Sequence, residues 1–184
     1  MKALLRGLVP VIAALALGGT AMAADLENTL YLDVPAGRVV IELRPDLAPD
    51  HVAQIKALAR RGFYDGVPFH RVIDGFMAQT GDPTGTGTGG SGHKLKAEFS
   101  GEKHVRGTTS MARATDPNSA DSQFFIMFAP APSLDGQYTI WGKVASGMEY
   151  IDQVKKGDQA RNGVVANPDK IVKMQVAADA EKAK

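Results

Sequence analysis

The fold is decided by residues 69–82, which read FHRVIDGFMAQTGD. Apolar residues lie on both sides of Gly75, and this pattern indicates two short strands, 67–72 and 76–79, joined by a tight turn. One cation, Arg71, lies inside the apolar pattern. Because arginine stays charged when it is buried, Arg71 either extends over core Phe and Met side chains to reach solvent or has a specific role.

Six further strands are predicted around this stretch. Apolar residues alternate with a period of two in 30–34 and 39–43, and Val34-Pro35-Ala36-Gly37 between them is typical of a tight turn. The other four segments are 109–112, 123–128, 138–144 and 171–176. Many short strands separated by turns favour a sandwich or a closed barrel, and a closed barrel leaves no strand edge exposed.

Two helices interrupt the strands. Pro49 suits a first helical turn, apolar residues then recur at helical spacing, and Gly62 ends the pattern, so we expect an amphipathic helix of about three turns. A shorter helix is predicted over 148–155. Residues 177–184 are small and charged, and we expect them to form a frayed tail.

The first 23 residues have the pattern of a cleavable signal peptide. Lys2 and Arg6 precede the largely apolar run 7–19, and Ala21-Met22-Ala23 places small residues where a signal peptidase cleaves. A transmembrane helix is the alternative, but the run is shorter than about 20 residues and contains Pro10. We therefore expect residues 24–184 to be a single exported domain, in the bacterial periplasm or outside the cell, with no membrane insertion after cleavage.

Composition excludes several classes of protein. The chain has 184 residues, of which 44% are hydrophobic and 22% charged, so a globular fold is expected. A net charge of +1 gives no indication of nucleic-acid binding. Because the chain has no cysteine, disulfides, a cysteine nucleophile and a thiolate zinc site are excluded.

Two stretches partly match nucleotide-binding motifs, but the residues around them do not support nucleotide binding. Residues 85–90, GTGTGG, match the glycine spacing of dinucleotide-binding proteins, but no helical pattern follows to receive a phosphate. A phosphate-binding P-loop would also need lysine where His93 stands. We interpret 85–92 as a flexible surface loop, and a nucleotide-binding titration would test this interpretation.

No metal or nucleophile site is predicted. The four histidines, His51, His70, His93 and His104, lack the spacing of metal ligands on one helix or strand face. No G-x-S-x-G turn presents a serine nucleophile. We therefore expect neither a metal nor another cofactor.

The stretch 69–82 also resembles the signature of the cyclophilins, a family of peptidyl-prolyl cis–trans isomerases. Four further segments resemble the family's motifs in the same order: SMAR at 110–113, SQFFI at 122–126, LDGQY at 134–138 and WGKV at 141–144. The resemblance extends from about Leu30 to Met174, and GDPTG at 81–85 is similar to the bacterial branch.

This resemblance implies a mainly β protein: a closed eight-stranded antiparallel barrel capped by two helices, with a substrate groove on its outer face. It implies that Arg71 is catalytic, donating a hydrogen bond to the proline nitrogen as the peptide bond twists. The implied substrate-binding residues are Phe76, Met77, Gln79, Ala112, Arg113, Phe125, Leu134 and Tyr138. His70, one residue before Arg71, is expected to point to the other side of its strand.

Each implied binding residue has its own role. Phe76, Met77, Phe125, Leu134 and Tyr138 form the apolar pocket for the proline ring. Gln79 binds the substrate backbone and helps to orient Arg71, Ala112 touches the residue before proline, and the main chain of Arg113 pairs with the substrate. The expected partners are proline-containing unfolded or partly folded polypeptides, without nucleic acid, and we expect a monomer.

The sequence departs from many family members at two groove positions. Ser133 stands where many have tryptophan, and Tyr138 where many have histidine. Because family members bind the cyclic peptide cyclosporin in this groove, we expect weak cyclosporin binding here. The alternative to an isomerase is a non-enzymatic chaperone that binds prolyl peptides in the same groove.

Overall fold

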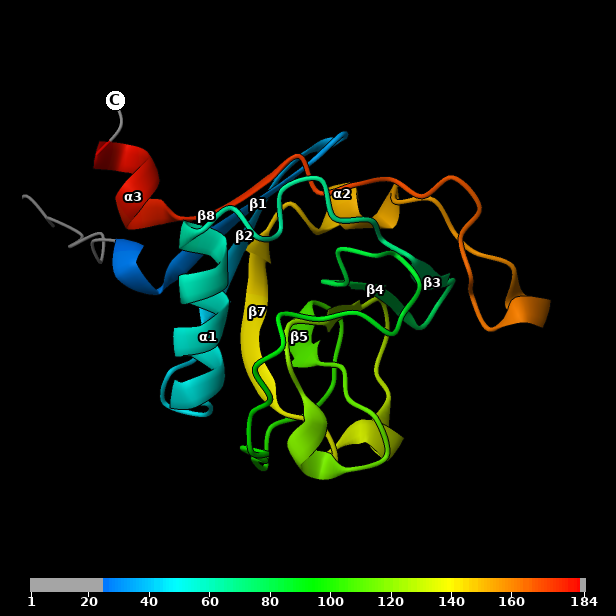
Figure 1. Cartoon of the computed structure of the whole chain (residues 1–184), viewed down its shortest axis with the longest axis horizontal. Helices are drawn as coiled ribbons and strands as arrows, with labels where there is room; N and C mark the ends of the chain where they lie inside the picture. Colours follow the sequence, from blue (N-terminus) through cyan, green and yellow to red (C-terminus); the bar gives the residue numbers. More distant parts are fainter. Residues whose placement is uncertain (1–24, 183–184) are drawn as a thin grey trace, which may run out of the picture.

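The computed structural model describes residues 25–182, which form an antiparallel sheet of eight strands with helices around it (Figure 1). The strands are β1 (Thr29–Val34), β2 (Gly37–Leu43), β3 (Arg71–Ile73), β4 (Met77–Thr80), β5 (Thr108–Met111), β6 (Phe124–Met127), β7 (Ile140–Ser146) and β8 (Lys173–Val176). The helices are α1 (Pro49–Arg60), α2 (Met148–Asp152) and α3 (Ala177–Lys182), with 3₁₀ turns η1 (Leu26–Asn28), η2 (Pro117–Ser119), η3 (Pro132–Leu134) and η4 (Gln159–Arg161). The prediction of a mainly β protein with strands in these eight segments is confirmed.

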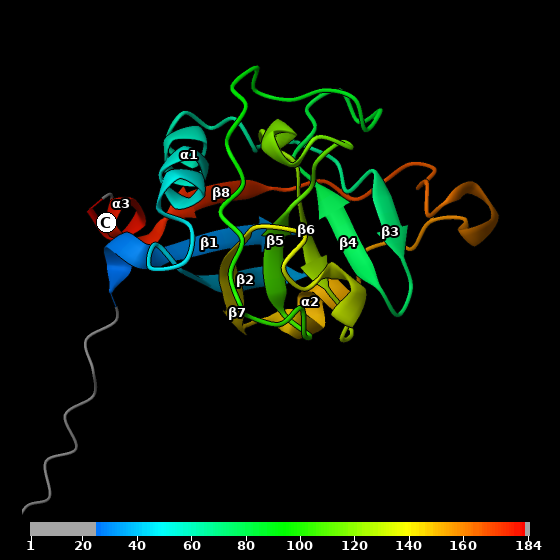
Figure 2. The ribbon, with the colours of Figure 1, turned by 90° about the horizontal axis from the view of Figure 1, so that it is seen from below.

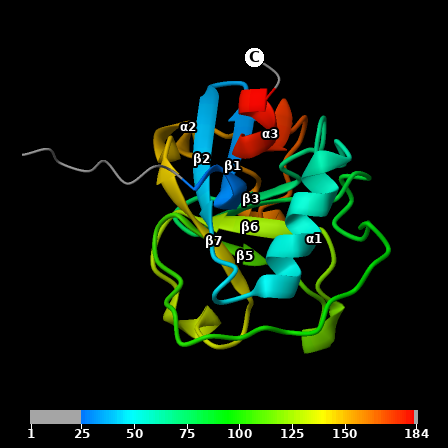
Figure 3. The same ribbon diagram turned by 90° about the vertical axis from the view of Figure 1, so that its left-hand side faces the viewer.

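The sheet does not close into a barrel. Its strand order is β3-β4-β6-β5-β7-β2-β1-β8, and neighbouring strands run antiparallel. The sheet curls strongly (Figures 2 and 3), but among the described residues β3 and β8 form no ladder with each other. The prediction of a closed barrel is therefore wrong, and the protein is an open half-barrel.

The segment between α2 and β8 provides hydrogen-bond partners for the free edge of β3. Residues 157–165, which we call the strap, run along the outer edge of β3 (Figure 2). The amide of Val72 donates to the carbonyl of Gly163 at 2.8 Å, and the carbonyl of Val72 accepts from the amide of Gly157 at 2.8 Å. Asn162 and Gly163 have φ angles of 54° and 78°, which a regular strand cannot contain. The strap thus covers this edge of β3, while the residues before β3 and before β8 meet directly: Phe69 donates its amide to the carbonyl of Asp169 at 2.9 Å, and Ile171 donates its amide to the carbonyl of Val67 at 2.9 Å.

The main core lies inside the curl. In β1 and β2, the alternate side chains of Leu30, Leu32, Val39 and Ile41 are fully buried, which confirms the period of two. Deeper in the molecule, Trp141 packs edge-to-face against another core ring, Phe124, with 5.3 Å between the ring centroids. The opposite faces of β3 and β4 remain available for a site on the outside.

Helix α1 has the boundaries that its sequence predicts. Pro49 is its first residue, Val52, Ile55 and Leu58 face the core, and Gly62 follows the helix with a left-handed φ of 67°. A glycine tolerates this conformation without the steric cost that a Cβ atom would bring. Helix α2 is shorter than predicted and ends at Asp152.

Glu98 caps the start of α1 from a distant loop. Its carboxylate accepts the amides of Asp50 at 3.2 Å and His51 at 3.1 Å, and lies 2.6 Å from His51 Nδ1. Burial alone would raise the pKa of Glu98, but the hydrogen bonds from His51 outweigh it and hold that pKa below its ordinary value. A carboxylate at a helix N-terminus also interacts favourably with the helix dipole.

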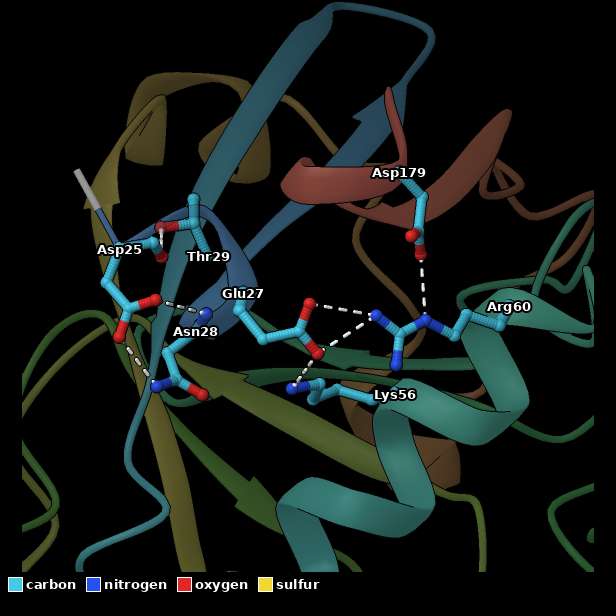
Figure 4. Close-up of polar contacts among 7 residues, drawn as sticks. All are labelled: Asp25, Glu27, Asn28, Thr29, Lys56, Arg60 and Asp179. Carbon is cyan, nitrogen blue, oxygen red and sulfur yellow. Dashed lines mark hydrogen bonds and ion pairs between the residues drawn. The ribbon is translucent and has the colours of Figure 1, made fainter. Parts of the chain in front are cut away.

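The two ends of the described chain meet on α1 (Figures 3 and 4). Glu27 in η1 contacts Lys56 at 2.5 Å and Arg60 at 2.9 Å. Arg60 also donates to Asp179 of α3 at 2.8 Å (Figure 4). Residues 177–182, for which we expected a frayed tail, therefore form a short helix that is held by an ion pair.

The segment predicted to be a signal peptide, residues 1–23, lies outside the described residues. Within residues 25–182, no helix is both long enough and apolar enough to span a membrane.

Candidate active site

The hairpin of β3 and β4 places Arg71 and Gln79 side by side. The two residues are directly opposite each other in the antiparallel register, and the chain turns at Gly75, whose φ is 69°. Directly opposite residues share one face of a sheet, so both side chains point outward. The next residue, Val72, belongs to the main core, and the preceding residue, His70, is also buried.

Three hydrogen bonds to neutral oxygens hold the Arg71 guanidinium. Nη1 donates to Gln79 Oε1 at 3.0 Å, Nε donates to the carbonyl oxygen of Asn162 at 3.0 Å, and Nη2 donates to Asn162 Oδ1 at 2.9 Å. Burial lowers the pKa of Arg71 from its ordinary value, yet a guanidinium stays protonated at neutral pH. The site therefore holds an oriented cation that these three bonds do not neutralise.

Arg71 lines a hollow of about 170 Å³ on the outer face of the sheet, whose walls combine polar and apolar side chains. The hollow is lined by all nine residues that the sequence resemblance implied: Arg71, Phe76, Met77, Gln79, Ala112, Arg113, Phe125, Leu134 and Tyr138. Buried Met77, Phe125 and Met127 form a separate apolar cluster beneath it, distinct from the main core.

His104 supports the floor of the hollow. Its ring stacks on Phe125 with 6.2 Å between centroids, and it lies edge-on to Tyr138. Nδ1 is 3.2 Å from Asp135 Oδ1, and Nε2 is 3.1 Å from Ser110 Oγ. Burial lowers the pKa of His104, which favours the neutral ring. Two polar anchors thus fix the aromatic floor.

Arg113 covers one side of the hollow. Its guanidinium carbon lies 4.6 Å from the centre of the Tyr138 ring, in cation–π geometry. Nε and Nη2 both donate to the carbonyl of Gln137, at 3.1 and 3.0 Å. The Tyr138 ring is therefore held between Arg113 and Phe125, which meets it edge-on at 5.8 Å.

The family model described as "Cyclophilin type peptidyl-prolyl cis-trans isomerase/CLD" matches residues 29–176. The chain belongs to the cyclophilins. It is 59% identical over 172 residues to a probable peptidyl-prolyl cis-trans isomerase of Brucella suis biovar 1 (strain 1330), covering 87% of this chain and 88% of that protein. It is 47% identical over 135 residues to peptidyl-prolyl cis-trans isomerase B of Bacillus subtilis (strain 168), covering 72% of this chain and 94% of that protein. The activity of this cyclophilin is peptidyl-prolyl cis–trans isomerisation.

Solved cyclophilin structures have the same fold. Cyclophilin AquaCyp293 from Hirschia baltica matches with a TM-score of 0.75 and 29% identity, covering 84% of this chain and 76% of that one. A cyclophilin-type isomerase of Cryptosporidium parvum, crystallised in the presence of the dipeptide Ala-Pro, matches with a TM-score of 0.74 and 32% identity. The match covers 80% of this chain and 98% of that one.

The glycine-rich loop of this cyclophilin is built around one buried carboxylate. Asp82 accepts the amides of Thr84 at 2.8 Å, Gly87 at 2.7 Å and Gly89 at 3.1 Å, together with the Thr84 hydroxyl at 2.8 Å. We expected a flexible loop, but Asp82 holds its first part, and Asp121 holds its end by accepting the amides of Ser91 at 2.8 Å and Gly92 at 2.9 Å. Residues 85–98 contain no helix that could receive a phosphate.

This loop connects to Arg71 through two glutamines. Gln123 Nε2 donates to the carbonyls of Gly87 at 3.0 Å and Gly89 at 2.8 Å. Gln123 Oε1 accepts from Gln79 Nε2 at 2.9 Å, and Gln79 in turn accepts from Arg71. A second hollow, of about 420 Å³, lies between the loop and the first and shares Gln79, Ala112 and Arg113 with it.

Three residues of this arrangement carry no signal in the sequence that predicts their place in the site: Asn162, His104 and Asp82. Asn162-Gly163 is a dipeptide typical of turns, but nothing in the sequence places it against Arg71. The sequence around His104 gives no indication that its ring stacks on Phe125. In the part of the chain that the structure describes, no three His, Cys, Asp or Glu side chains are grouped so that they could hold a metal ion.

The lowered pKa of Asp82 predicts that the free energy of unfolding depends on pH. Burial alone would raise its pKa, but the hydrogen bonds from Thr84, Gly89 and Gly87 outweigh it and lower the pKa from 3.8 to about 2. Its carboxylate therefore stabilises the fold above about pH 4, and this contribution is lost as the pH falls from about 4 to 2. Asp82→Asn should lower the free energy of unfolding by about 2 kcal/mol at pH 7 and by much less near pH 2.

Urea unfolding at a series of pH values measures this difference. Asp74→Asn is the matched control, because Asp74 is an exposed aspartate in the turn between β3 and β4. Parallel stability curves for wild type and Asp82→Asn from pH 7 down to pH 2 would contradict the prediction.

Proposed function

We propose that this cyclophilin isomerises Xaa-Pro bonds in exported polypeptides, with Arg71 as its catalytic residue. The observation that supports this best is the outer-face hollow, in which Arg71 shares the lining with the apolar side chains of Phe76, Phe125 and Leu134. The Cryptosporidium parvum structure determined with Ala-Pro supports proline-containing peptides as the ligand class.

The chemistry needs neither a nucleophile nor a metal. Rotation about a peptide bond is slow because the nitrogen lone pair is delocalised, with a barrier of about 18–20 kcal/mol. In the twisted state this conjugation is lost, and the proline nitrogen becomes pyramidal and basic. A hydrogen bond to that nitrogen exists only in the twisted state, so it lowers the barrier without stabilising the planar substrate equally.

Arg71 has donors available for this bond. A guanidinium carries five N–H groups, and three of them donate to Gln79 and Asn162. Nη1 also lies 4.0 Å from the sulfur of Met77, which lines the hollow. The guanidinium thus reaches the apolar pocket while its other edge is fixed.

The walls of the hollow bind the rest of the substrate. Phe76, Met77, Phe125, Leu134 and Tyr138 enclose the pyrrolidine ring. Gln79 binds the substrate backbone and orients Arg71, Ala112 touches the residue before proline, and the main chain of Arg113 pairs with the substrate strand. In this pose, the chain before proline runs toward the second hollow beside the glycine loop.

Arg71 alone does not account for the whole rate. A charge-assisted hydrogen bond contributes about 1.5–3 kcal/mol, whereas a rate gain of about 10⁵ needs about 7 kcal/mol. The remainder comes from holding the flanking chain in the twisted geometry and from excluding water that stabilises the planar, more polar amide.

The isomerase activity of this family argues against the alternative, a chaperone that binds prolyl peptides in the same hollow without catalysis. Binding alone needs only the apolar walls. A cation held by neutral oxygens at the margin of the pocket favours catalysis, because such a cation keeps its capacity to donate to a developing basic nitrogen. A proline-isomerisation assay on a short peptide separates the two functions.

The catalytic assignment predicts the effect of changing Arg71. Arg71→Ala should lower kcat/KM about 10- to 1000-fold, and Arg71→Lys should recover only part, because an ammonium lacks the planar fork. Arg161→Ala is the control, because Arg161 lies on the strap, pairs with Asp158 and does not line the hollow. A folded Arg71→Ala protein with more than half of the wild-type activity would refute the assignment.

Export predicts the N-terminus of the mature protein. Lys2, Arg6 and Ala21-Met22-Ala23 favour cleavage that leaves Ala24, or a residue within two of it, as the first residue. N-terminal sequencing of protein recovered from the cell envelope or medium measures this. Recovery of Met1 from protein made in its own cells would exclude cleavage.

Ser133 predicts weak cyclosporin binding. Ser133 is exposed on η3, next to Leu134 in the hollow wall, where serine offers neither an indole N–H nor an aromatic face. Losing a neutral hydrogen bond costs about 0.5–1.5 kcal/mol, and losing an aromatic contact costs a similar amount. Binding should therefore be at least about tenfold weaker than in a tryptophan-bearing cyclophilin.

Titration of cyclosporin against wild type and Ser133→Trp tests this expectation. The tryptophan variant should bind more tightly, while its turnover of short peptides changes little. Ser146→Trp is the control, because Ser146 is exposed at the end of β7 and does not line the hollow. Equal inhibition constants for wild type and Ser133→Trp would show that this position lies outside the cyclosporin contact.

A further inference from the structure

The strap brings Asn162 to Arg71 from a distant part of the chain. In Figures 1 and 2 the segment containing η4 lies beside β3, at the end of the sheet that carries the hollow. The bonds that fix the strap to β3 run between main-chain atoms, including the amide of Val165 and the carbonyl of His70 at 3.1 Å. The Asn162 side chain is therefore not needed to attach the strap.

Asn162 turns two acceptors toward one guanidinium. It follows η4 in a left-handed conformation, with φ 54° and ψ 36°, and its amide donates to the carbonyl of Gln159 at 3.2 Å. Its main-chain oxygen accepts from Arg71 Nε, and its Oδ1 accepts from Arg71 Nη2. These two N–H groups form one edge of the planar guanidinium, so one residue fixes the whole plane.

The neutrality of these acceptors matters for the reaction. A carboxylate at this position would pair with the guanidinium as a full charge, and it would compete with the substrate nitrogen for the cation. An amide oxygen and a carbonyl oxygen orient the guanidinium and leave its charge in place. Gln79 holds Nη1 in the same way from the neighbouring strand.

We propose that Asn162 is a positioning residue for Arg71, holding its guanidinium plane toward the proline nitrogen through Oδ1 and the main-chain oxygen. This inference rests on the proposed catalytic role of Arg71. Asn162 does not line the hollow, so it acts through Arg71 and not on the substrate.

The test uses Asn162→Gly. Glycine accepts the left-handed backbone and keeps the main-chain oxygen, so this change removes Oδ1 with little backbone strain. On a short Xaa-Pro peptide, we expect kcat/KM to fall about 3- to 10-fold, with an almost unchanged thermal unfolding midpoint. In an Arg71→Ala background the same change should alter kcat/KM by less than about twofold, because no guanidinium remains to be positioned.

Asn167→Gly is the matched control. Asn167 is exposed on the same connection between α2 and β8, has a φ of 53°, and makes no contact with Arg71. This variant should keep wild-type activity.

Each result decides a different point. Wild-type activity in Asn162→Gly, or an equal loss with and without Arg71, would overturn the positioning role while Arg71→Ala still shows its own loss. Full activity in Arg71→Ala alone would overturn the catalytic assignment itself, and the positioning role with it.

Discussion

The short strand β3 needs hydrogen-bond partners on both of its edges, and the rest of the structure follows from how it obtains them. β4 supplies one edge, and the strap supplies the other through main-chain bonds to Val72. An unpaired edge would be costly to bury and prone to pair with other chains. Because the strap covers this edge, Asn162 comes to lie against Arg71.

The polar part of the site is a continuous set of hydrogen bonds from the glycine loop to the strap. Asp82 shapes the loop, the loop carbonyls fix Gln123, and Gln123 fixes Gln79. Gln79 and Asn162 then hold Arg71 from two sides. The carboxylate of this set is separated from the guanidinium by the loop and two neutral amides, so Arg71 is oriented without being paired to an anion.

Structural elements and site residues could be predicted from the sequence where a local pattern or a motif indicates them. The period of two located β1 and β2, the helical spacing after Pro49 located α1, and the motif resemblance identified the lining of the hollow. Contacts across long separations could not be predicted: Asn162 meets Arg71 from 91 residues away. The open sheet could not be predicted, because nothing local in the sequence shows that the strap, and not β8, lies along the edge of β3. The tail was misjudged because the bond from Arg60 to Asp179, 119 residues apart, holds α3.

The ion pairs of Arg60 with Glu27 and Asp179 have a practical consequence. They gather η1 and α3, the two ends of the described chain, on α1, away from the β3–β4 hairpin that carries the hollow (Figures 1 and 4). A surface, a fusion partner or an affinity tag attached next to Asp25 or Lys182 would leave the substrate face open to solution. Immobilised protein can therefore meet long client chains, and a short linker between the neighbouring ends is a natural starting point for circular permutation.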